Sequence, residues 1–247
     1  LQNGNFMGLS QSFGSGKFGK ESLTPVAQLR KLEPVVFLLR LHFCDFVSKI
    51  AQTGVDKIMF EDDFTFSGGK TTAERASCCC EKHLDKYSEI IGRRVKREEL
   101  CNLLYLDGPN EYRKKWFDMQ GEILQNFCKE IETAVHSVNS DVRIGLSANS
   151  SSYIQEGVTV DKLAKIIAGK TRPFIRMTGA PYWQNMPVFA TCIDAIRVQT
   201  EWCEDGIELI TEGDTFPRPR HWVPANKLEA YDMILRADGK SHGILKY

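Results

Sequence analysis

Short apolar runs alternate with longer amphipathic stretches along most of this chain. The apolar runs predict strands at 7–10, 56–61, 143–146, 173–177, 207–211 and 243–247. Apolar residues at helical spacing predict helices at about 25–53, 111–137, 160–168, 189–200 and 228–235. The segment 67–115 is more polar, and we expect only two short helices in it. The repeated order of strand and helix predicts a parallel sheet with helices outside it.

This order is typical of the α/β class and, within it, of the (β/α)8 TIM barrel. Such a barrel usually needs about 250 residues and eight strand–helix units. The chain has 247 residues, but the single connection from residue 62 to residue 142 takes up roughly 80 of them. We therefore expect one domain over 1–247 that is an incomplete barrel. It would hold strands 3 to 8 and lack its first two βα units.

Two of the predicted strands end in acidic residues. Glu61, Asp62 and Asp63 follow one apolar run, and Glu212 and Asp214 follow another. Carboxylates at the ends of buried strands are costly to desolvate, so they usually serve a function. Because the C-terminal ends of barrel strands share one face, the two clusters are expected to line a common site.

Two carboxylates across a barrel mouth suit glycoside hydrolysis, in which one group protonates the leaving oxygen and the other acts as nucleophile or base. We assign the nucleophile to Glu212, because Gly213 lets the chain turn sharply after it. The acid/base is Asp62 or Asp63, since strand alternation directs only one of them inward, and Asp62 is preferred. Two other interpretations stay open. The acids could cap strand and helix ends, or Glu61, Asp62 and Asp63 could bind a divalent metal.

Loops that follow the other strands supply candidate contacts to a sugar. Tyr182 and Trp183 could stack on the apolar face of a sugar ring, or could fill the core. Asn149 could bind a hydroxyl group or cap a helix. The full set of candidate substrate-binding residues is Glu61, Asn149, Arg176, Tyr182, Trp183, Asp214, Arg218 and His221.

A cysteine-rich segment lies in the long connection after the first acidic cluster. Cys78, Cys80 and His83 have a Cys-x-Cys-x-x-His spacing, and all three are zinc-ligand types. A structural zinc site usually has four ligands, and Cys44 could be the fourth only if its helix end folds back. Without a metal, these side chains would simply stabilise the loop. The proposed hydrolysis itself requires no cofactor.

The net charge and the cysteine pattern limit the classes of partner and the cellular compartment that we expect. The formal net charge is zero, so no broad attraction to nucleic acid is expected. No apolar run reaches the roughly 18 residues that crossing a bilayer requires. The eight cysteines lack the regular spacing of a secreted disulfide scaffold, which favours a reducing compartment such as the cytoplasm. The expected partner is a carbohydrate substrate, and self-association into a homo-oligomer stays open.

Two segments also resemble known barrel proteins. Residues 56–64, DKIMFEDDF, with the CCCEKH run at 78–83, look like bacterial glycoside-hydrolase-like TIM-barrel proteins. They are similar, more distantly, to the family 42 beta-galactosidases, in which a strand-4 acid precedes a zinc-binding cysteine cluster. Residues 212–218, EGDTFPR, resemble the strand-7 segment that carries the nucleophile of such enzymes.

The resemblance spans roughly residues 5–247 as strands 3 to 8, and it implies a glycosidase with Glu212 as nucleophile. The chain departs from the family pattern in two places. An aspartate stands where the acid/base is usually glutamate, and His83 stands where the last cysteine would fall. Because a fold does not fix a function, two alternatives remain: a non-catalytic carbohydrate-binding barrel and a divalent-metal-dependent barrel enzyme.

Overall fold

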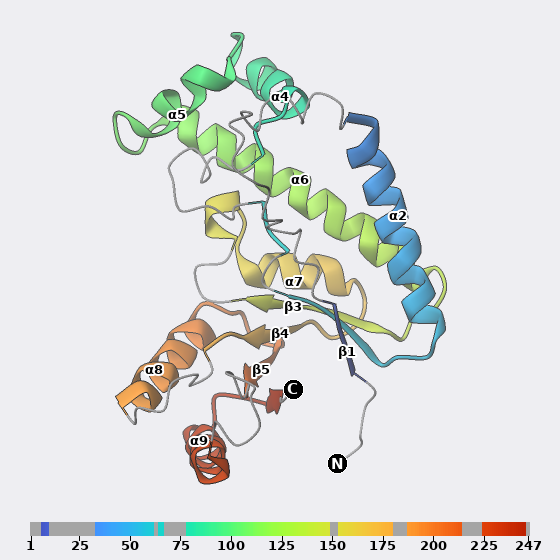
Figure 1. Ribbon diagram of the computed structural model, residues 1–247, viewed down its shortest axis with the longest axis vertical. Helices are drawn as coiled ribbons and strands as arrows, with labels where there is room; N and C mark the ends of the chain where they lie inside the picture. The colour runs from blue at the N-terminus through green and yellow to red at the C-terminus, as the bar shows by residue number, and fades with distance from the viewer. Residues whose placement is uncertain are drawn as a thin grey trace, which may run out of the picture.

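The computed structural model of the chain describes residues 6–9, 33–61, 64–66, 78–148, 153–179, 187–213 and 224–245. Its strands are β1 (Phe6–Leu9), β2 (Lys57–Phe60), β3 (Arg143–Ala148), β4 (Phe174–Met177), β5 (Glu208–Glu212) and β6 (Gly243–Leu245). Each strand pairs in parallel with the next one along the chain, so the sheet order is β1-β2-β3-β4-β5-β6 (Figure 1). The predicted α/β class and the parallel sheet are confirmed.

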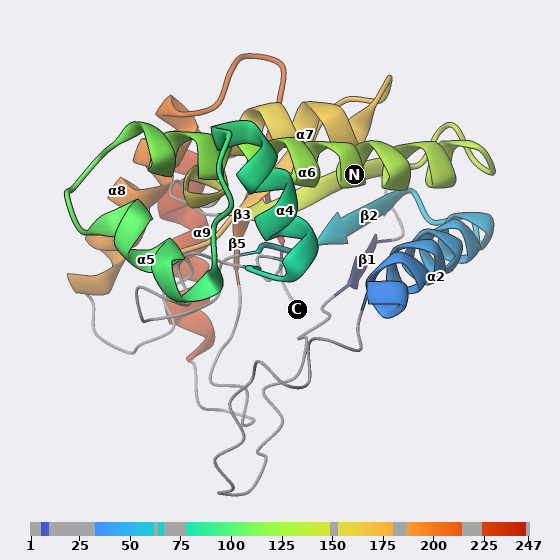
Figure 2. The ribbon, with the colours of Figure 1, turned by 90° about the horizontal axis from the view of Figure 1, so that it is seen from above.

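Helices fill the connections between these strands. They are α2 (Glu33–Gln52), α4 (Glu81–Ile91), α5 (Arg97–Tyr105), α6 (Glu111–His136), the 3-10 turn η1 (Ile154–Glu156), α7 (Val160–Ala168), α8 (Pro187–Glu201) and α9 (Ala225–Asp238). Figures 1 and 2 show α6 and α7 side by side over the sheet, with α2 along the other flank of α6 and α8 and α9 beside β5. None of the described helices combines the length and hydrophobicity needed to cross a bilayer.

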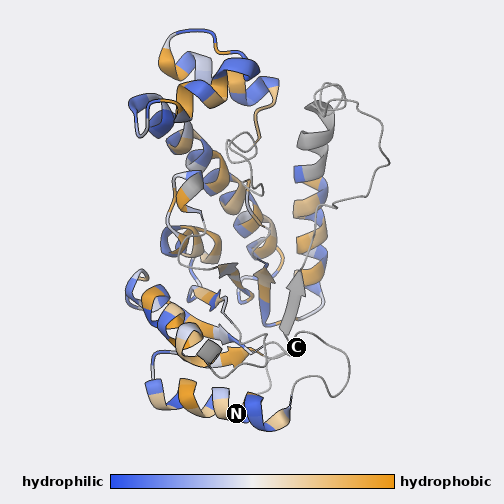
Figure 3. Ribbon diagram, turned by 60° about the vertical axis from the view of Figure 1, so that its left-hand side comes forward, coloured by the Kyte–Doolittle hydropathy of each residue, from blue (hydrophilic) through white to orange (hydrophobic). Residues whose placement is uncertain are grey.

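The main hydrophobic core lies between the helices and one face of the sheet. Alternate strand residues, such as Ile58, Ile144 and Ile175, point to this face and are almost completely buried. Helices α6 and α7 pack against them through residues such as Ile131 and Leu163. Figure 3 shows hydrophobic residues interleaved with hydrophilic ones along these helices, as expected for helices with one buried face. Each fully buried aliphatic side chain contributes about 1.5–3 kcal/mol.

The opposite face of the sheet is concave. Lys57 on β2 and Glu208 on β5 form an ion pair of 3.3 Å, although β3 and β4 lie between their strands. In a flat sheet, strands three positions apart would be separated by roughly 14 Å. Met59, Phe174 and Ile210, from β2, β4 and β5, likewise pack in one cluster. The sheet therefore curls as the wall of a barrel does.

Side chains on the concave face form three layers along the strands. Lys57, Arg143 and Glu208 form an ionic layer at the N-terminal ends of the strands. An apolar layer comes next, and Gly145 is required in it: a Cβ there would lie 2.6 Å from the ring of Phe174. The third layer, at the C-terminal ends, is again charged. An apolar layer thus separates the two charged layers on the concave face.

The polar segment before α6 has its own small core, which the sequence pattern did not predict. Buried residues of α4, α5 and the first half of α6 pack together, separately from the main core. Tyr87 packs edge-on against Trp116, with ring centroids 5.0 Å apart, and its hydroxyl donates to the carbonyl of Tyr112. Asn110 caps α6 by accepting a hydrogen bond from the N–H of Arg113.

The edges of the sheet bear on the barrel prediction. In the part of the chain that the structure describes, β1 and β6 each pair with one neighbour, so these six strands form an open, curved sheet. Such a sheet is consistent with a TIM-barrel-like fold. Closure into eight strands stays a prediction.

Candidate functional site

The charged layer at the C-terminal ends of the strands is built around Arg176 of β4. One terminal nitrogen of its guanidinium donates a 2.6 Å hydrogen bond to Glu61 Oε2, and the other lies 2.6 Å from Glu212 Oε1. The Arg176 side chain is 3% exposed, Glu212 5% and Glu61 15%. A guanidinium is planar and compact, so it holds the two carboxylates that it contacts near each other.

Two of the predicted acidic positions are therefore brought together from distant parts of the chain. Glu61 follows β2 directly, and Glu212 is the last residue of β5. The N–H of Gly213 donates to the carbonyl of Leu245 on β6, which fixes the backbone immediately after Glu212. Arg176, predicted only as a contact near the pocket, is the group that holds the two carboxylates in place.

The turn after β4 supplies a further contact to Glu212. Its Oε2 atom accepts a 3.1 Å hydrogen bond from the backbone N–H of Gly179. The carbonyl of the same glycine accepts a hydrogen bond from the Tyr231 hydroxyl of α9. Burial raises the pKa of Tyr231, so its hydroxyl stays neutral and can donate throughout the ordinary pH range.

Eight of the predicted site residues lie outside the described residues. They are the acid/base candidates Asp62 and Asp63 and the substrate-binding candidates Asn149, Tyr182, Trp183, Asp214, Arg218 and His221. Their assignments stay predictions.

The predicted metal ligands do come together. One ligand atom from each of Cys78, Cys80 and His83 lies within 4.8 Å of the others. His83 Nδ1 lies 2.8 Å from the carbonyl oxygen of Cys78, and to bond there it must carry the proton, which leaves Nε2 as the ligand atom of a neutral ring. The hydrogen bond from Cys78 lowers the pKa of Cys80 against the effect of burial, and His83 adds to this.

The fourth ligand that we considered is elsewhere. Cys44 lies on α2 and packs against the main core, and within the described residues the candidate metal cluster has three members. All eight cysteines are described, and each is a free thiol. The three donors suit zinc by type and spacing, and an additional ligand would be needed for a four-coordinate site.

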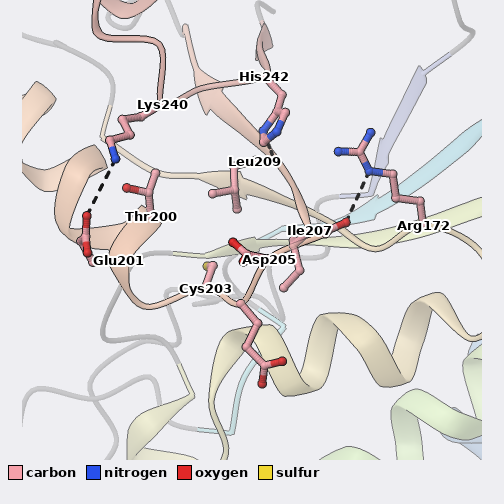
Figure 4. A pocket seen from close by; sticks show the side chains of 11 residues that line it. Arg172, Thr200, Glu201, Cys203, Asp205, Ile207, Leu209, Lys240 and His242 are labelled. Atoms are coloured by element: carbon pink, nitrogen blue, oxygen red, sulfur yellow. Dashed lines mark hydrogen bonds and ion pairs between the residues drawn. The ribbon is translucent and has the colours of Figure 1, made fainter.

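A separate pocket lies at the opposite, N-terminal end of the strands (Figure 4). It has a volume of about 390 Å³ and lies between the connection from α8 to β5 and the residues before β6. Its polar groups largely pair with one another: Lys240 lies 3.9 Å from Glu201, and His242 accepts a hydrogen bond from the N–H of Leu209. Among the described residues that line this pocket, Glu61, Arg176 and Glu212 are absent, so the pocket is distinct from the site where these three meet.

Comparison with known proteins supports the fold. No family model matches the chain, and no curated protein matches it. The PgaB (BpsB) glycoside hydrolase domain from Bordetella bronchiseptica superimposes with a TM-score of 0.54 at 12% identity, covering 83% of this chain and 56% of that domain. The catalytic domain of beta-amylase from Paenibacillus polymyxa gives a TM-score of 0.43 at 11% identity, over 84% of this chain and 61% of that one. The chain thus spans little more than half of the first domain, whose architecture it shares.

Some residues around Glu212 were not predicted from the sequence. Gly179, Gln199 and Tyr231 contribute through a backbone N–H or through hydrogen bonds to backbone carbonyls. A glycine two residues after a strand is a recognisable signal for an unusual turn. Gln199 and Tyr231 gave no such signal, because polar residues on amphipathic helices are common.

Proposed function

We propose that this chain is the catalytic barrel of a glycoside hydrolase, with Glu212 as the nucleophile and Asp62 or Asp63 as the acid/base. The observation that carries the proposal is the meeting of Glu61 and Glu212 at Arg176, on the concave face of a parallel sheet at the C-terminal strand ends. Catalytic residues of barrel enzymes come from these strand ends. The proposal includes an eight-stranded barrel of which β1 to β6 are strands 3 to 8.

The geometry gives each described residue a role in this chemistry. Arg176 and the N–H of Gly179 both contact the Glu212 carboxylate, and these contacts would orient it for attack on an anomeric carbon. Glu61 anchors the end of β2 at the same guanidinium, which places that end beside Glu212. Asp62 and Asp63 follow Glu61 in the sequence, and one of them would protonate the leaving-group oxygen.

The residues beyond the described part complete the proposed sugar site. Tyr182 and Trp183 would stack on the sugar ring, while Asn149, Asp214, Arg218 and His221 would bind hydroxyl groups. The PgaB domain is a glycoside hydrolase domain by description, and this supports the choice of a carbohydrate as the substrate class. A cytoplasmic location and a homo-oligomeric state remain predictions from the sequence.

A carbohydrate-binding barrel without turnover is the second candidate. The buried ion pairs of Arg176 with Glu61 and Glu212 favour it, because such pairs also occur as purely structural features. A divalent-metal enzyme built on Glu61, Asp62 and Asp63 is the third. Loss of hydrolysis on removing divalent ions would support that enzyme.

Hydrolysis of a panel of chromogenic aryl glycosides by the full-length protein tests the proposal. We expect the wild type to cleave at least one glycoside, and Glu212→Gln to lower that rate about 100-fold or more, because a transition-state interaction is lost. Glu204→Gln is the matched control, since Glu204 is exposed and pairs with Lys165 on the outer surface. Equal rates for wild type and Glu212→Gln would refute the nucleophile. Binding of sugars without cleavage by the wild type would support the second candidate.

We also propose a structural zinc ion at Cys78, Cys80 and His83. The support is the convergence of three donor atoms of zinc-ligand type within 4.8 Å. The site lies at the N-terminal end of α4, where the chain enters the small core of α4, α5 and α6. Zinc there would stabilise this long connection, and the hydrolysis would not require it.

A further inference from the structure

The turn that follows β4 is held from three sides. The N–H of Thr178 donates to the carbonyl of Ala148 on β3 at 3.1 Å, which extends the sheet ladder by one residue. Gln199 of α8 donates from its side-chain amide to the carbonyl of Thr178 at 2.9 Å. Tyr231 of α9 donates to the carbonyl of Gly179 at 3.3 Å. Two helices and a neighbouring strand therefore fix two consecutive residues.

Both side chains that hold the turn are themselves fixed. Tyr231 is fully buried, and its ring stacks on Phe189 of α8 with centroids 5.8 Å apart. Gln199 is 5% exposed and also donates to the carbonyl of Ala195 one helical turn earlier. Buried polar side chains that hydrogen-bond a loop backbone restrict its conformations. The turn is thus anchored by groups with little freedom of their own.

The backbone of Gly179 has a conformation that other residues rarely adopt. Its φ is +141°, and a Cβ built on it would meet no atom within 4 Å. Space therefore does not require glycine at this position, whereas the backbone angle does. That angle accompanies the orientation in which the N–H points at Glu212 Oε2, 3.1 Å away.

We propose that Gln199 and Tyr231 are positioning residues, which hold the Thr178–Gly179 turn so that the Gly179 N–H orients the Glu212 carboxylate. We call the hydrogen bonds from Gln199 and Tyr231 to the Thr178–Gly179 turn the clamp. The effect of the two residues on catalysis rests on the proposed function, whereas the clamp does not. Neither side chain needs to touch the substrate. Orientation of a nucleophile by a fixed donor contributes to rate because misplacement by about 1 Å can cost two orders of magnitude.

Two measurements on full-length Tyr231→Phe test this inference, since the variant keeps the buried ring and removes only the hydroxyl. The first is amide hydrogen exchange at Gly179 by NMR in the ligand-free protein, which we expect to become about fivefold faster. The second is hydrolysis of the best aryl glycoside, for which we expect kcat to fall about tenfold and KM to stay within twofold. Gln199→Leu should act in the same direction in both measurements.

Matched controls separate positioning from general loosening. Tyr87→Phe removes an equivalent hydroxyl, 2.7 Å from a backbone carbonyl in the small helical core, and should change neither measurement. Gly179→Ala should lower kcat further than Tyr231→Phe. Gly206→Ala introduces a similar strain at φ +90° before β5, again with no atom near the new Cβ, and should leave kcat unchanged.

The outcomes also separate this inference from the proposed function. Unchanged exchange at Gly179 in Tyr231→Phe would overturn the clamp, whether or not the protein hydrolyses glycosides. Faster exchange with an unchanged kcat would overturn the positioning role. If Glu212→Gln keeps the wild-type rate, the proposed function fails, and exchange at Gly179 still decides the clamp.

Discussion

Replacing Arg176 by methionine perturbs the group that joins the two carboxylates. Methionine is similar in length but uncharged, so Glu61 and Glu212 would face each other without the guanidinium that lies 2.6 Å from each of them. Removing one partner of a buried ion pair typically costs about 3–5 kcal/mol, because a buried charge is left uncompensated. That is a large part of the roughly 5–15 kcal/mol by which a typical domain is stable.

Urea unfolding of wild type and variant measures this cost. Thermal unfolding is a second measurement: at about 2–4 °C per kcal/mol for a chain of this size, the melting temperature should fall by roughly 6–20 °C. Lys114→Met is the control: Lys114 is 67% exposed and its partner Asp118 is 55% exposed, so loss of this surface pair should cost much less than loss of Arg176. Adding Glu212→Gln to Arg176→Met should recover part of the lost stability. A cost for Arg176→Met as small as that of Lys114→Met, or no recovery in the double variant, would refute this reasoning.

Three further predictions concern the layers beneath the site and the cysteine cluster. Gly145→Ala should destabilise the protein by about 1–3 kcal/mol in urea unfolding, because its Cβ would collide with Phe174, whereas Gly243→Ala, with no atom within 4 Å, should be close to neutral. Burial alone would raise the pKa of Glu208, but Arg143 and Lys57 outweigh it and hold that pKa below its ordinary value. The stabilisation from Glu208 is therefore present above the ordinary glutamate pKa and is lost as the pH falls through the lower folded value. The difference in unfolding free energy between wild type and Glu208→Gln should accordingly shrink on acidification. A difference that does not depend on pH would contradict the ion pair. Metal analysis of the purified protein should find about one zinc per chain, lost in Cys80→Ser and kept in Cys79→Ser, and equal zinc in both variants would argue against the site.

The sheet could be predicted from the sequence because strand and helix periodicities differ clearly. The run from Lys57 to Phe60 and the run ending at Glu212 are apolar and short, and both form strands within a residue or two of the predicted bounds. The small core around Trp116 was not predicted, because its apolar residues are spread over three short helical segments in a polar stretch. The curvature of the sheet could not be predicted from the sequence pattern either, because it depends on contacts between β2 and β5, which are about 150 residues apart in the chain.

Only part of the candidate site could be predicted from the sequence. Two acidic strand ends predicted that Glu61 and Glu212 would share one face, and the structure brings them to one guanidinium. The role of Arg176 as the bridge between them could not be read from sequence, because it depends on the strand order and the curl of the sheet. The same holds for Gly179, which acts through a backbone N–H that any residue type possesses.

The most direct test of the account is to identify the carboxylate that forms a covalent bond with the sugar. The full-length protein would be incubated with 2-deoxy-2-fluoro glycosides that carry an activated leaving group, matched to the aryl glycoside it cleaves best, and its peptides would be analysed by mass spectrometry. The account predicts one added fluorosugar on the peptide that contains Glu212, located on that residue, and no labelling of Glu212→Gln. Cleavage of the aryl glycoside with the label on a different carboxylate, or with no label, would contradict it.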